Sequence, residues 1–421
     1  MLRARRAVHL FFHCQDDRFP DLDAFFRGES GTVAERRVYA LSLLRSEAFP
    51  ISREELDLVL SFPSEEWREV PADLQDQVRS LARSGILVTD DADPDLAALR
   101  ARDEQLETAG WNLYSAFHYL MTKWSGVDLR GSPDEGEFPP ITEETLAEFV
   151  RWRGRPPEPF HAVEDPLAVQ ELPLVRREGG LYEALQARKT TRGFDRSGRL
   201  TIEDLAVVLY EVWGCHGTAP ILDDLFCIKR TSPSGGGLHP IEVYPIVSGV
   251  DGVEPGLYHY GVRDHSLELI ERLAEGEAVA LAATFLCGQN YFGSAHVSFV
   301  MTARFPRNHW KYPGQQKAYT VMLMDAAHLS QTLYLVAAEL GLGAFVTAAV
   351  NAIDIEARLG MDGVTEGVVA AAGCGLPYAD GSPFEPRGAG KTFLRLLATT
   401  IASPVALMPP PSAARGCLGC R

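Results

Sequence analysis

The stretch from Arg230 to Pro240 has a composition suited to binding a ligand through its backbone. It reads RTSPSGGGLHP, with Pro233 and Ser234 ahead of three glycines that begin with Gly235 and Gly236. Glycine adopts positive φ without steric penalty and lets a ligand approach the backbone closely. Successive N–H groups in such a turn form a concave site for oxygen or ring-nitrogen atoms. The stretch therefore predicts a ligand-binding loop, and the alternative is a plain connection between strands.

A second group of residues could bind phosphate. Arg188, Lys189 and Arg192 flank two threonines directly after a predicted short helix over residues 181–187. Arginine binds phosphate through two parallel hydrogen bonds, and hydroxyl groups add further donors. The segment therefore predicts a phosphate site, with a solvated basic turn as the alternative.

Lys311 and Tyr312 follow an apolar run over residues 297–303 that is typical of a central strand. A lysine can accept a proton only when burial or a neighbouring cation lowers its pKa towards the working pH. Trp310 would supply an apolar wall and Tyr312 a hydroxyl partner for such a lysine. The alternative is that Lys311 is a surface lysine that follows a strand.

Composition and charge argue against several classes of protein. The chain has 421 residues and a formal net charge of -17, whereas nucleic-acid binders normally carry a basic surface. We find no apolar run of the roughly 18 residues that span a bilayer, so we expect no membrane partner. The seven cysteines are scattered and odd in number, which indicates free thiols in a reducing compartment. We therefore expect a cytoplasmic protein that binds neither nucleic acid nor membrane.

Two patterns near the C-terminal end resemble metal and nucleotide motifs but do not satisfy them. Cys417 and Cys420 form a single CxxC pair, and a tail is a better interpretation than a metal site. Residues 387–392 read RGAGKT, but the phosphate-loop motif requires a glycine where Glu385 stands. Since the HExxH and GxSxG motifs are also missing, we expect no metal ion and no nucleotide hydrolysis.

The order of predicted elements divides the chain into four parts. Residues 1–12 predict a strand, Ser52 and Glu55 form a capping box before a helix, and further helices are predicted over residues 72–84 and 96–123. This outline makes residues 1–125 a winged-helix-like or peptide-docking domain, with a packing domain that binds no ligand as the alternative. Residues 126–175 are a Pro/Gly-rich connector, residues 176–400 a larger domain, and residues 401–421 a tail.

The larger domain alternates strand and helix patterns. Strands are predicted over residues 241–247, 256–260 and 297–303. A long helix over residues 319–340 is apolar on almost every face, so we expect it at the centre of the domain or in a subunit interface. Gly341 and Gly343 end this helix.

The order of these motifs resembles the nitroreductase-like flavin superfamily over roughly residues 160–400. The motifs are Arg188–Phe194, Pro233–Gly237, Gly256–Tyr260, Lys311–Tyr312, Glu339–Gly343 and Gly375–Pro377. Within the superfamily, the chain is most similar to the SagB-type dehydrogenases that form thiazoles and oxazoles in peptides. The resemblance implies an α+β fold, in which a mixed central sheet is flanked by helices behind an N-terminal winged-helix-like domain.

The resemblance also implies FMN as cofactor and assigns roles to individual residues. The Lys311–Tyr312 pair would abstract a proton. The chain departs from the family pattern at residues 313–317, 327–328 and 331–332. Three groups of residues would contact FMN: Arg188, Lys189 and Arg192, with Arg387 or Lys391, at the phosphate; Pro233, Ser234, Gly235 and Gly236 at the ring; and Gly341 and Gly343 near the flavin or the dimer seam.

The function that follows is an FMN-dependent dehydrogenase that matures ribosomally made peptides by oxidising azoline rings to azoles. The expected partners are a precursor peptide, a second copy of the chain and cyclodehydratase-type proteins. Two alternatives remain open. One is an NAD(P)H-dependent flavin reductase of small molecules or dehydroamino acids, and the other is a non-catalytic scaffold of a peptide-modifying complex.

Overall fold

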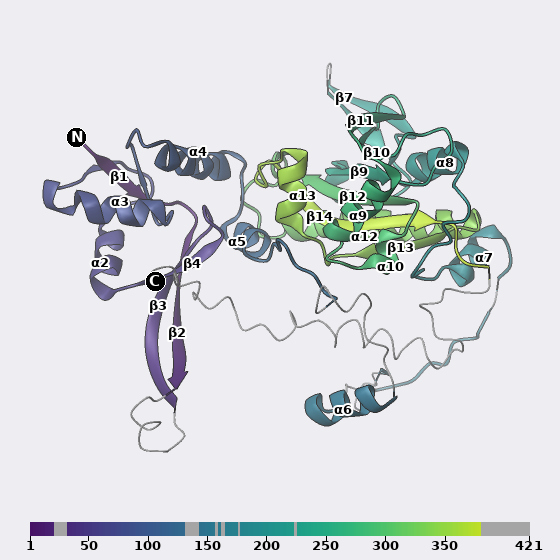
Figure 1. Ribbon diagram of the computed structural model, residues 1–421, viewed down its shortest axis with the longest axis horizontal. Helices are drawn as coiled ribbons and strands as arrows, with labels where there is room; N and C mark the ends of the chain where they lie inside the picture. The colour runs from purple at the N-terminus through teal and green to yellow at the C-terminus, as the bar shows by residue number, and fades with distance from the viewer. Residues whose placement is uncertain are drawn as a thin grey trace.

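The computed structural model describes residues 1–20, 32–130, 143–155, 159–160, 165–175, 177–222 and 225–379. Figure 1 shows two bodies of secondary structure side by side, with one helix-containing segment running between them. We call residues 1–108 the N-terminal unit, residues 109–125 the bridging segment and residues 177–379 the C-terminal unit. The domain boundaries expected at residues 125, 175 and 400 stay predictions, and the tail over residues 401–421 lies outside the described residues.

The N-terminal unit is α/β, as predicted, and contains two small sheets. Ser52 and Glu55 form the expected capping box at the start of α2. The predicted first strand over residues 1–12 is wrong as a single element, because the chain leaves β1 at Arg6 and pairs again only from Leu10, in a long hairpin (Figure 1). The elements are β1 (Arg3–Arg6), β2 (Leu10–Pro20), β3 (Thr32–Ser42), β4 (Glu47–Ile51), α2 (Arg53–Ser61), β5 (Arg68–Glu69), η1 (Ala72–Leu74), α3 (Gln75–Arg83), β6 (Leu87–Thr89) and α4 (Pro94–Thr108).

The C-terminal unit is built on a six-stranded sheet in the order β11-β10-β9-β12-β14-β13. Its five strand pairs are antiparallel, and Thr190 adds a parallel bridge to Ala344 at the β13 edge. The strands are β9 (Ile241–Val247), β10 (Gly256–Gly261), β11 (Ser266–Arg272), β12 (Val297–Arg304), β13 (Gly343–Thr347) and β14 (Glu366–Gly375), beside a separate hairpin of β7 (Gly217–Leu222) and β8 (Leu225–Lys229). The helices are α7 (Gly180–Ala187), α8 (Ile202–Trp213), η2 (Gly235–Gly237), α9 (Glu275–Phe285), α10 (Asn290–Gly293), α11 (Phe305–His309), α12 (Ala318–Glu339) and α13 (Ala352–Leu359). In the sequence, α5 (Leu113–Met121) and α6 (Glu143–Arg153) come between the two units.

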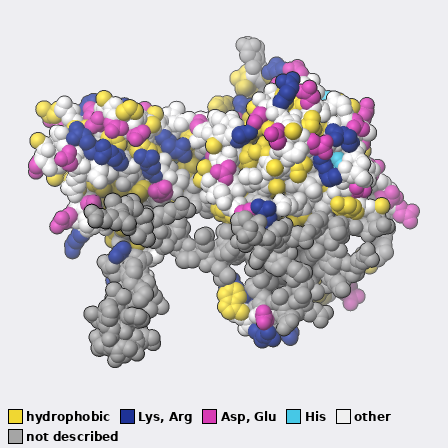
Figure 2. Space-filling model, in the orientation of Figure 1, with side chains coloured by type: hydrophobic (Ala, Val, Ile, Leu, Met, Phe, Trp, Pro, Cys, Tyr) yellow, Lys and Arg dark blue, Asp and Glu magenta, His cyan; other side chains and the backbone are white. Residues whose placement is uncertain are grey.

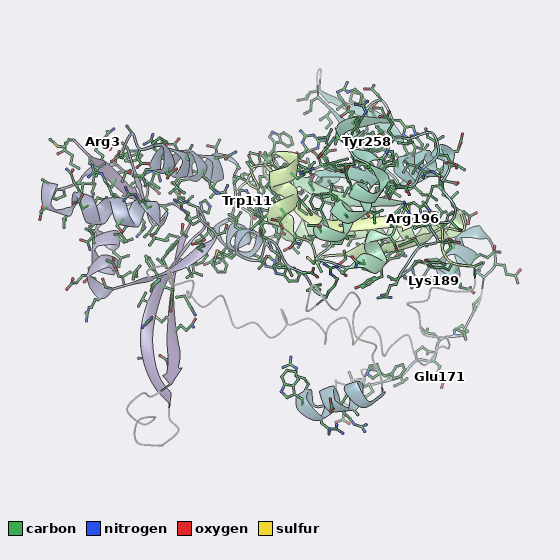
Figure 3. The ribbon with its side chains drawn as sticks, in the orientation of Figure 1. Arg3, Trp111, Glu171, Lys189, Arg196 and Tyr258 are labelled. Carbon is green, nitrogen blue, oxygen red and sulfur yellow. The ribbon has the colours of Figure 1, made fainter. Side chains whose placement is uncertain are left out.

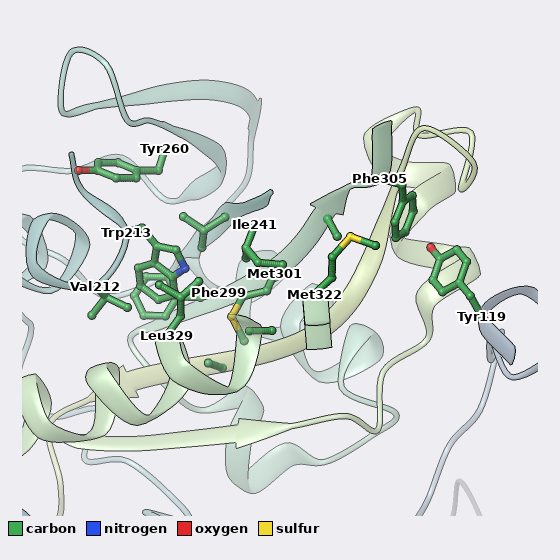
Figure 4. Packing of buried hydrophobic residues seen from close by; sticks show 14 of the residues in the cluster. Tyr119, Val212, Trp213, Ile241, Tyr260, Phe299, Met301, Phe305, Met322 and Leu329 are labelled. Atoms are coloured by element: carbon green, nitrogen blue, oxygen red, sulfur yellow. The ribbon is translucent and has the colours of Figure 1, made fainter. Parts of the chain in front are cut away.

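Alternating side chains of the central strands divide the apolar core between the two faces of the sheet. Phe299 and Met301 of β12 pack with α8 and α12 on one face, whereas Val300 packs with α9, α10 and α13 on the other. Figure 4 shows Met322 and Leu329 of α12 in the first of these clusters. A mixed α/β fold with helices on the sheet is therefore confirmed.

Helix α12 is the long apolar helix that the sequence predicts. By length and composition it could cross a membrane, and it is the one helix in the described part of the chain that could. It packs against α7, α8 and β13, and one face is exposed at Met324 and Gln331. These contacts are typical of a helix in the core of a folded domain.

The helix predicted over residues 96–123 is wrong, because the structure has two helices there. Helix α4 ends at Thr108, and α5 begins after Asn112, whose side chain accepts hydrogen bonds from the N–H groups of Tyr114 and Ser115. Gly110 adopts a φ of +74° at the break, which a glycine reaches without strain. The break turns the bridging segment towards the C-terminal unit.

The bridging segment packs into the C-terminal unit through aromatic and charged side chains. Tyr119 lies beside Phe305 with 4.9 Å between ring centroids, as Figure 4 shows. The Tyr119 hydroxyl donates to Glu356 at 2.6 Å, and the same carboxylate forms an ion pair with Lys123. Both charged side chains are only 7% exposed. The two units are therefore joined by a continuous core and by a buried ion pair.

Replacing Lys123 with methionine should lower the free energy of unfolding by about 3 kcal/mol, because the Glu356 carboxylate would stay buried without its cation. Urea unfolding followed by circular dichroism measures the change. The matched control is Lys229→Met, at an exposed lysine, which should change the free energy by less than about 0.5 kcal/mol. Equal effects of the two substitutions would show that the ion pair does not stabilise the fold.

Candidate active site

The glycine-rich loop is fixed by a carboxylate from the apolar helix α12. Ser234 donates its hydroxyl proton to Asp325 Oδ2 at 2.5 Å, and the Gly235 N–H donates to Oδ1 at 2.9 Å. The Ser234 hydroxyl in turn accepts the N–H of His239 at 2.9 Å. Burial raises the pKa of Asp325, and the hydrogen bonds from Ser234 and Gly235 act in the opposite direction. Asp325 therefore holds Ser234 and Gly235 directly, and the Ser234 hydroxyl connects them to His239.

Gly235 and Gly236 are required where they stand for different reasons. A Cβ atom on Gly235 would lie 1.9 Å from Val321 Cγ1, so the backbone lies directly against α12. Gly236 has a φ of +69°. A Cβ atom there would lie 2.8 Å from the Tyr312 hydroxyl and 3.1 Å from Lys311 Nζ. The loop thus presents bare backbone to the Lys311–Tyr312 pair.

Lys311 and Tyr312 reach this loop from the turn that follows α11. Lys311 is exposed and Trp310 is 70% exposed, so the expectation that Trp310 forms an apolar wall around Lys311 is wrong for the protein without bound ligand. Lys311 Nζ donates to the Gly236 carbonyl oxygen at 3.3 Å and lies 5.7 Å from the centroid of the Tyr312 ring. The N–H groups of both residues donate to the Asn308 carbonyl oxygen, at 3.2 and 3.1 Å. Two motifs far apart in the sequence are therefore brought together, as an active site that uses both would require.

The basic segment lies further along the same helix. The Arg188 guanidinium lies 5.4 Å from the centroid of the Tyr334 ring, and the Thr190 and Tyr334 hydroxyls are 3.0 Å apart. Lys189 is exposed beside α7, as Figure 3 shows, and Arg192 is close enough to Tyr291 to influence its pKa. At a rise of about 1.5 Å per residue, Tyr334 lies about 14 Å along α12 from Asp325.

Thr191 connects the basic segment to the end of the sheet. Its N–H donates to the Ala344 carbonyl oxygen at 2.8 Å. Its hydroxyl is buried without a hydrogen-bond partner in the protein. A Cβ atom on Gly343 would lie 2.6 Å from Thr191, which explains the glycine by packing.

Gly341 has a structural reason to be glycine, and two predicted residues are not described. Gly341 has a φ of +69° and follows the C-terminus of α12, where Leu342 N–H donates back to Ala337 at 2.7 Å. This geometry ends a helix and does not by itself indicate a ligand. Arg387 and Lys391 lie outside the described residues.

Asp325, Tyr334 and His239 belong to the site region and were not singled out by the sequence. Asp325 had a usable signal, because a carboxylate inside an apolar helix needs hydrogen-bond donors. His239 has a φ of +46°, which is uncommon for a residue other than glycine. Its partners become apparent only in three dimensions.

Two described cavities lie near arginine side chains. One of 410 Å³ is lined by Arg304, Pro306, Arg307, Thr365 and Glu366, next to α11. The other, of 590 Å³, lies in the N-terminal unit among Arg36, Arg37, Arg53 and apolar residues of β3, β4 and α2. On the face shown in Figure 2, acidic and basic side chains are intermixed. Within the described ranges, no cluster of His, Cys, Asp and Glu side chains could hold a metal ion.

Comparison with known proteins identifies the family. The model of the Nitroreductase family matches residues 185–376, which contain the glycine-rich loop, the Lys311–Tyr312 pair and the basic segment. The "Putative nitroreductase MJ1384" of Methanocaldococcus jannaschii is 30% identical over 163 residues, which are 39% of this chain and 75% of that protein. The chain belongs to the nitroreductase family.

Two further matches are a relative by sequence and a solved structure. The trifolitoxin-processing protein TfxB of Rhizobium leguminosarum bv. trifolii is 32% identical over 145 residues, or 34% of this chain. The chain spans only 39% of the length of TfxB. The E. coli microcin synthetase McbBCD complex with bound truncated pro-MccB17 contains a chain with 18% identity and a TM-score of 0.45, over 65% of this chain and 92% of that one.

The His239 side chain should titrate far below an ordinary histidine. Burial, with the charges of Arg230 and Arg307, lowers its pKa to about 4, whereas hydrogen bonds to Glu242 and Glu268 raise the pKa of His259 to about 9. NMR titration of the ring carbons measures both values, with the variants His239→Asn and His259→Gln for assignment. A His239 midpoint near 6.5 would contradict the described surroundings.

The same shift predicts a pH dependence of stability. Between pH 6.5 and about 4 the unfolded chain binds a proton at His239 that the folded chain does not, so stability falls as the pH falls. Because the ring is partly exposed, we expect about 1 kcal/mol. Because burial also lowers the pKa values of His9, His296 and His309, the loss between pH 6.5 and 4 should be smaller by this amount in His239→Asn, and thermal unfolding against pH measures the difference.

Proposed function

We propose that the protein is an FMN-dependent dehydrogenase that oxidises azoline rings to azoles in a ribosomally made peptide. The observation that carries the proposal is the contact of Lys311 and Tyr312 with Gly236, on a loop whose shape is fixed by Asp325. This contact places a candidate base and a hydroxyl beside exposed backbone. The name of the relative TfxB supports a peptide as the substrate.

The residues present are suitable for FMN. Arg188, Lys189 and Arg192 would hold the phosphate, and the buried Thr191 hydroxyl is a donor without a protein partner. Pro233, Ser234, Gly235 and Gly236 would contact the ring through backbone that carries no Cβ atoms at its two glycines. Both groups border α12, so a single elongated ligand could contact them together.

The chemistry divides between cofactor and protein. FMN, when bound, would accept the electron pair that leaves the substrate as hydride. Lys311 is exposed, so a bound substrate would have to cover its amine before Lys311 could remove the proton from the ring carbon. The two hydrogens lost would then leave as a proton and a hydride. The hydrogen bond to Gly236 would orient the amine, and the Tyr312 ring lies 5.7 Å from it. An electron acceptor, for which dioxygen is the simplest candidate, would then reoxidise the flavin.

The proposal extends to partners and location. A precursor peptide would dock on the N-terminal unit, where the cavity lined by Arg36, Arg37 and Arg53 could receive an acidic segment. A homodimer is supported by exposed apolar side chains on neighbouring helices, including Leu181 at 61% and Met324 at 53% exposure. Cyclodehydratase-type proteins would supply the azoline, and we propose a cytoplasmic location.

A second function, reduction of small molecules with NAD(P)H, is favoured by one observation. The M. jannaschii relative named as a nitroreductase is covered over 75% of its length. This function would use the same flavin site and would not require the Lys311–Tyr312 pair as a base. Turnover of NAD(P)H that is insensitive to Lys311→Ala would favour it.

The purified protein should bind FMN, and Arg188→Ala should weaken FMN affinity about tenfold, because one charge-assisted hydrogen bond to phosphate is lost. Visible absorption before and after heat release identifies the flavin, and titration of apoprotein gives the affinity. The matched control is Arg263→Ala, at an exposed arginine on the β10–β11 turn. A colourless protein that cannot be reconstituted would contradict the assignment of FMN.

Lys311→Ala should lower turnover about 100-fold or more, and Tyr312→Phe about tenfold, while bound FMN stays unchanged. The probe is a short synthetic peptide that carries one thiazoline ring, and mass spectrometry follows the loss of two hydrogens. Lys317→Ala, at an exposed lysine of the following turn, is the control. Full activity of both Lys311→Ala and Tyr312→Phe would show that the base has been assigned incorrectly.

A further inference from the structure

The turn that carries Lys311 and Tyr312 is held on both flanks by the bridging segment. Before the pair, His309 Nδ1 donates to the Ala109 carbonyl oxygen at 2.8 Å. After the pair, Gly314 N–H donates to the Gly110 carbonyl oxygen at 3.0 Å. The break between α4 and α5 is therefore a docking point for the turn on which the proposed base stands.

Side chains of the bridging segment add two further contacts. Asn112 Nδ2 donates to the Gly314 carbonyl oxygen at 3.0 Å. The Ser115 hydroxyl, which is buried, donates to the Gln316 carbonyl oxygen at 3.1 Å. Gly314 is thus bound through both its N–H and its carbonyl group, so its peptide planes are fixed on either side.

An aromatic anchor holds the bridging segment itself in place. The Trp111 ring lies 4.6 Å from Phe305 and 4.9 Å from His309, measured between centroids, and is 5% exposed. Its indole N–H donates to the Val364 carbonyl oxygen at 2.9 Å. Figure 3 shows Trp111 where the two units meet. Because the Trp111 ring is buried and hydrogen-bonded, it holds in place the neighbouring residues Asn112 and Ser115, which bind the turn.

Close packing at Gly110 restricts this arrangement further. A Cβ atom on Gly110 would lie 3.3 Å from His309 Cβ and 3.9 Å from Pro313. The backbone at Gly110 lies so close to His309 and Pro313 that a larger residue at position 110 would not fit without a shift. The contact therefore depends on backbone geometry on both sides.

We propose that Asn112 is a positioning residue for Lys311 and Tyr312, through its hydrogen bond to Gly314. The inference rests on the proposed function, which makes Lys311 the base. Asn112 does not touch the reacting atoms, but it fixes the turn from which the amine reaches Gly236. The family model covers residues 185–376, so this contribution comes from outside the segment that defines the family. The bridging segment thereby helps to position the proposed base of the C-terminal unit.

The test separates the hydrogen bond to Gly314 from the helix cap that Asn112 also provides. Asn112→Ser keeps an oxygen that can accept from the N–H groups of α5 but loses the amide donor. Thr201→Ala removes the side-chain cap of α8, away from this turn, and controls for a general loss of stability. Both substitutions are introduced into the full-length protein, and each variant is purified in the same way as the wild type. Thermal unfolding should change similarly in the two.

The first readout does not depend on activity. Competitive labelling with an amine reagent, resolved by peptide mass spectrometry, should show Lys311 labelled about threefold or more faster in Asn112→Ser than in the wild type, with Lys229 as internal reference. Hydrogen exchange at the Gly314 amide should speed up about tenfold. Thr201→Ala should change neither. Unchanged labelling and exchange in Asn112→Ser would overturn the proposal.

The second readout uses the synthetic thiazoline peptide. In Asn112→Ser we expect kcat to fall about tenfold, with KM within about twofold and FMN content unchanged, because the base is misplaced and binding is not. Equal kcat would also overturn the proposal. If Lys311→Ala keeps full activity, the proposed base is wrong, and the labelling experiment still decides whether Asn112 positions the turn.

Two further measurements apply if Asn112→Ser does not fold. Ser115→Ala removes the separate hydrogen bond to Gln316 and should speed the labelling of Lys311 in the same direction. In the wild type, the Gly314 amide should exchange much more slowly than in an unstructured peptide. An unprotected Gly314 amide would show that the contact does not exist in solution.

Discussion

The carboxylate of Asp325 is the interaction on which the candidate site depends most. It lies within an apolar helix, and a buried carboxylate is stable only if donors satisfy its oxygens. The donors are the hydroxyl of Ser234 and the N–H of Gly235. Because the same hydroxyl also accepts from the His239 N–H, one acidic group is connected to the loop at Ser234 and Gly235 and, through Ser234, at His239. The position of Gly236, and with it the contact to Lys311, follows from this arrangement.

A second constraint acts from the opposite side of the site. The turn bearing Lys311 and Tyr312 is bound to the Gly236 carbonyl oxygen on one side and to the bridging segment on the other. The first contact lies within the family segment, whereas the second comes from residues that the family model does not include. The site therefore combines residues of the family segment with a contribution from the bridging segment, which lies outside it. Such an addition can adjust the geometry of a base without changing the fold that carries it.

Much of the fold could be predicted because its patterns are local. The capping box at Ser52 and the apolar strand of β12 are read from neighbouring residues, and the structure contains both. The family was recognised from the order of short motifs, and this recognition is confirmed. The roles of Lys311, Tyr312 and the basic segment stay predictions, although the structure brings Lys311 and Tyr312 to the loop.

The errors arose where distant contacts override local preference. The helical spacing continues through Gly110, and an isolated glycine in such a pattern can belong to a helix. The break follows from contacts with His309 and Gly314, which lie far away in the sequence. The hairpin of β2 and β3 was missed for a similar reason, since a single strand was expected where the chain leaves one sheet and enters another.

The position of Trp111 and Tyr119 has a consequence for dissecting this protein into parts. Both rings belong to the apolar cluster that also contains Phe305 and Tyr319 of the C-terminal unit. If the chain were truncated within the connector over residues 126–175, the C-terminal fragment would lack the Trp111 and Tyr119 side chains of that cluster. The unit that folds cooperatively is therefore larger than the segment that sequence similarity defines, and its N-terminal limit lies before the bridging segment.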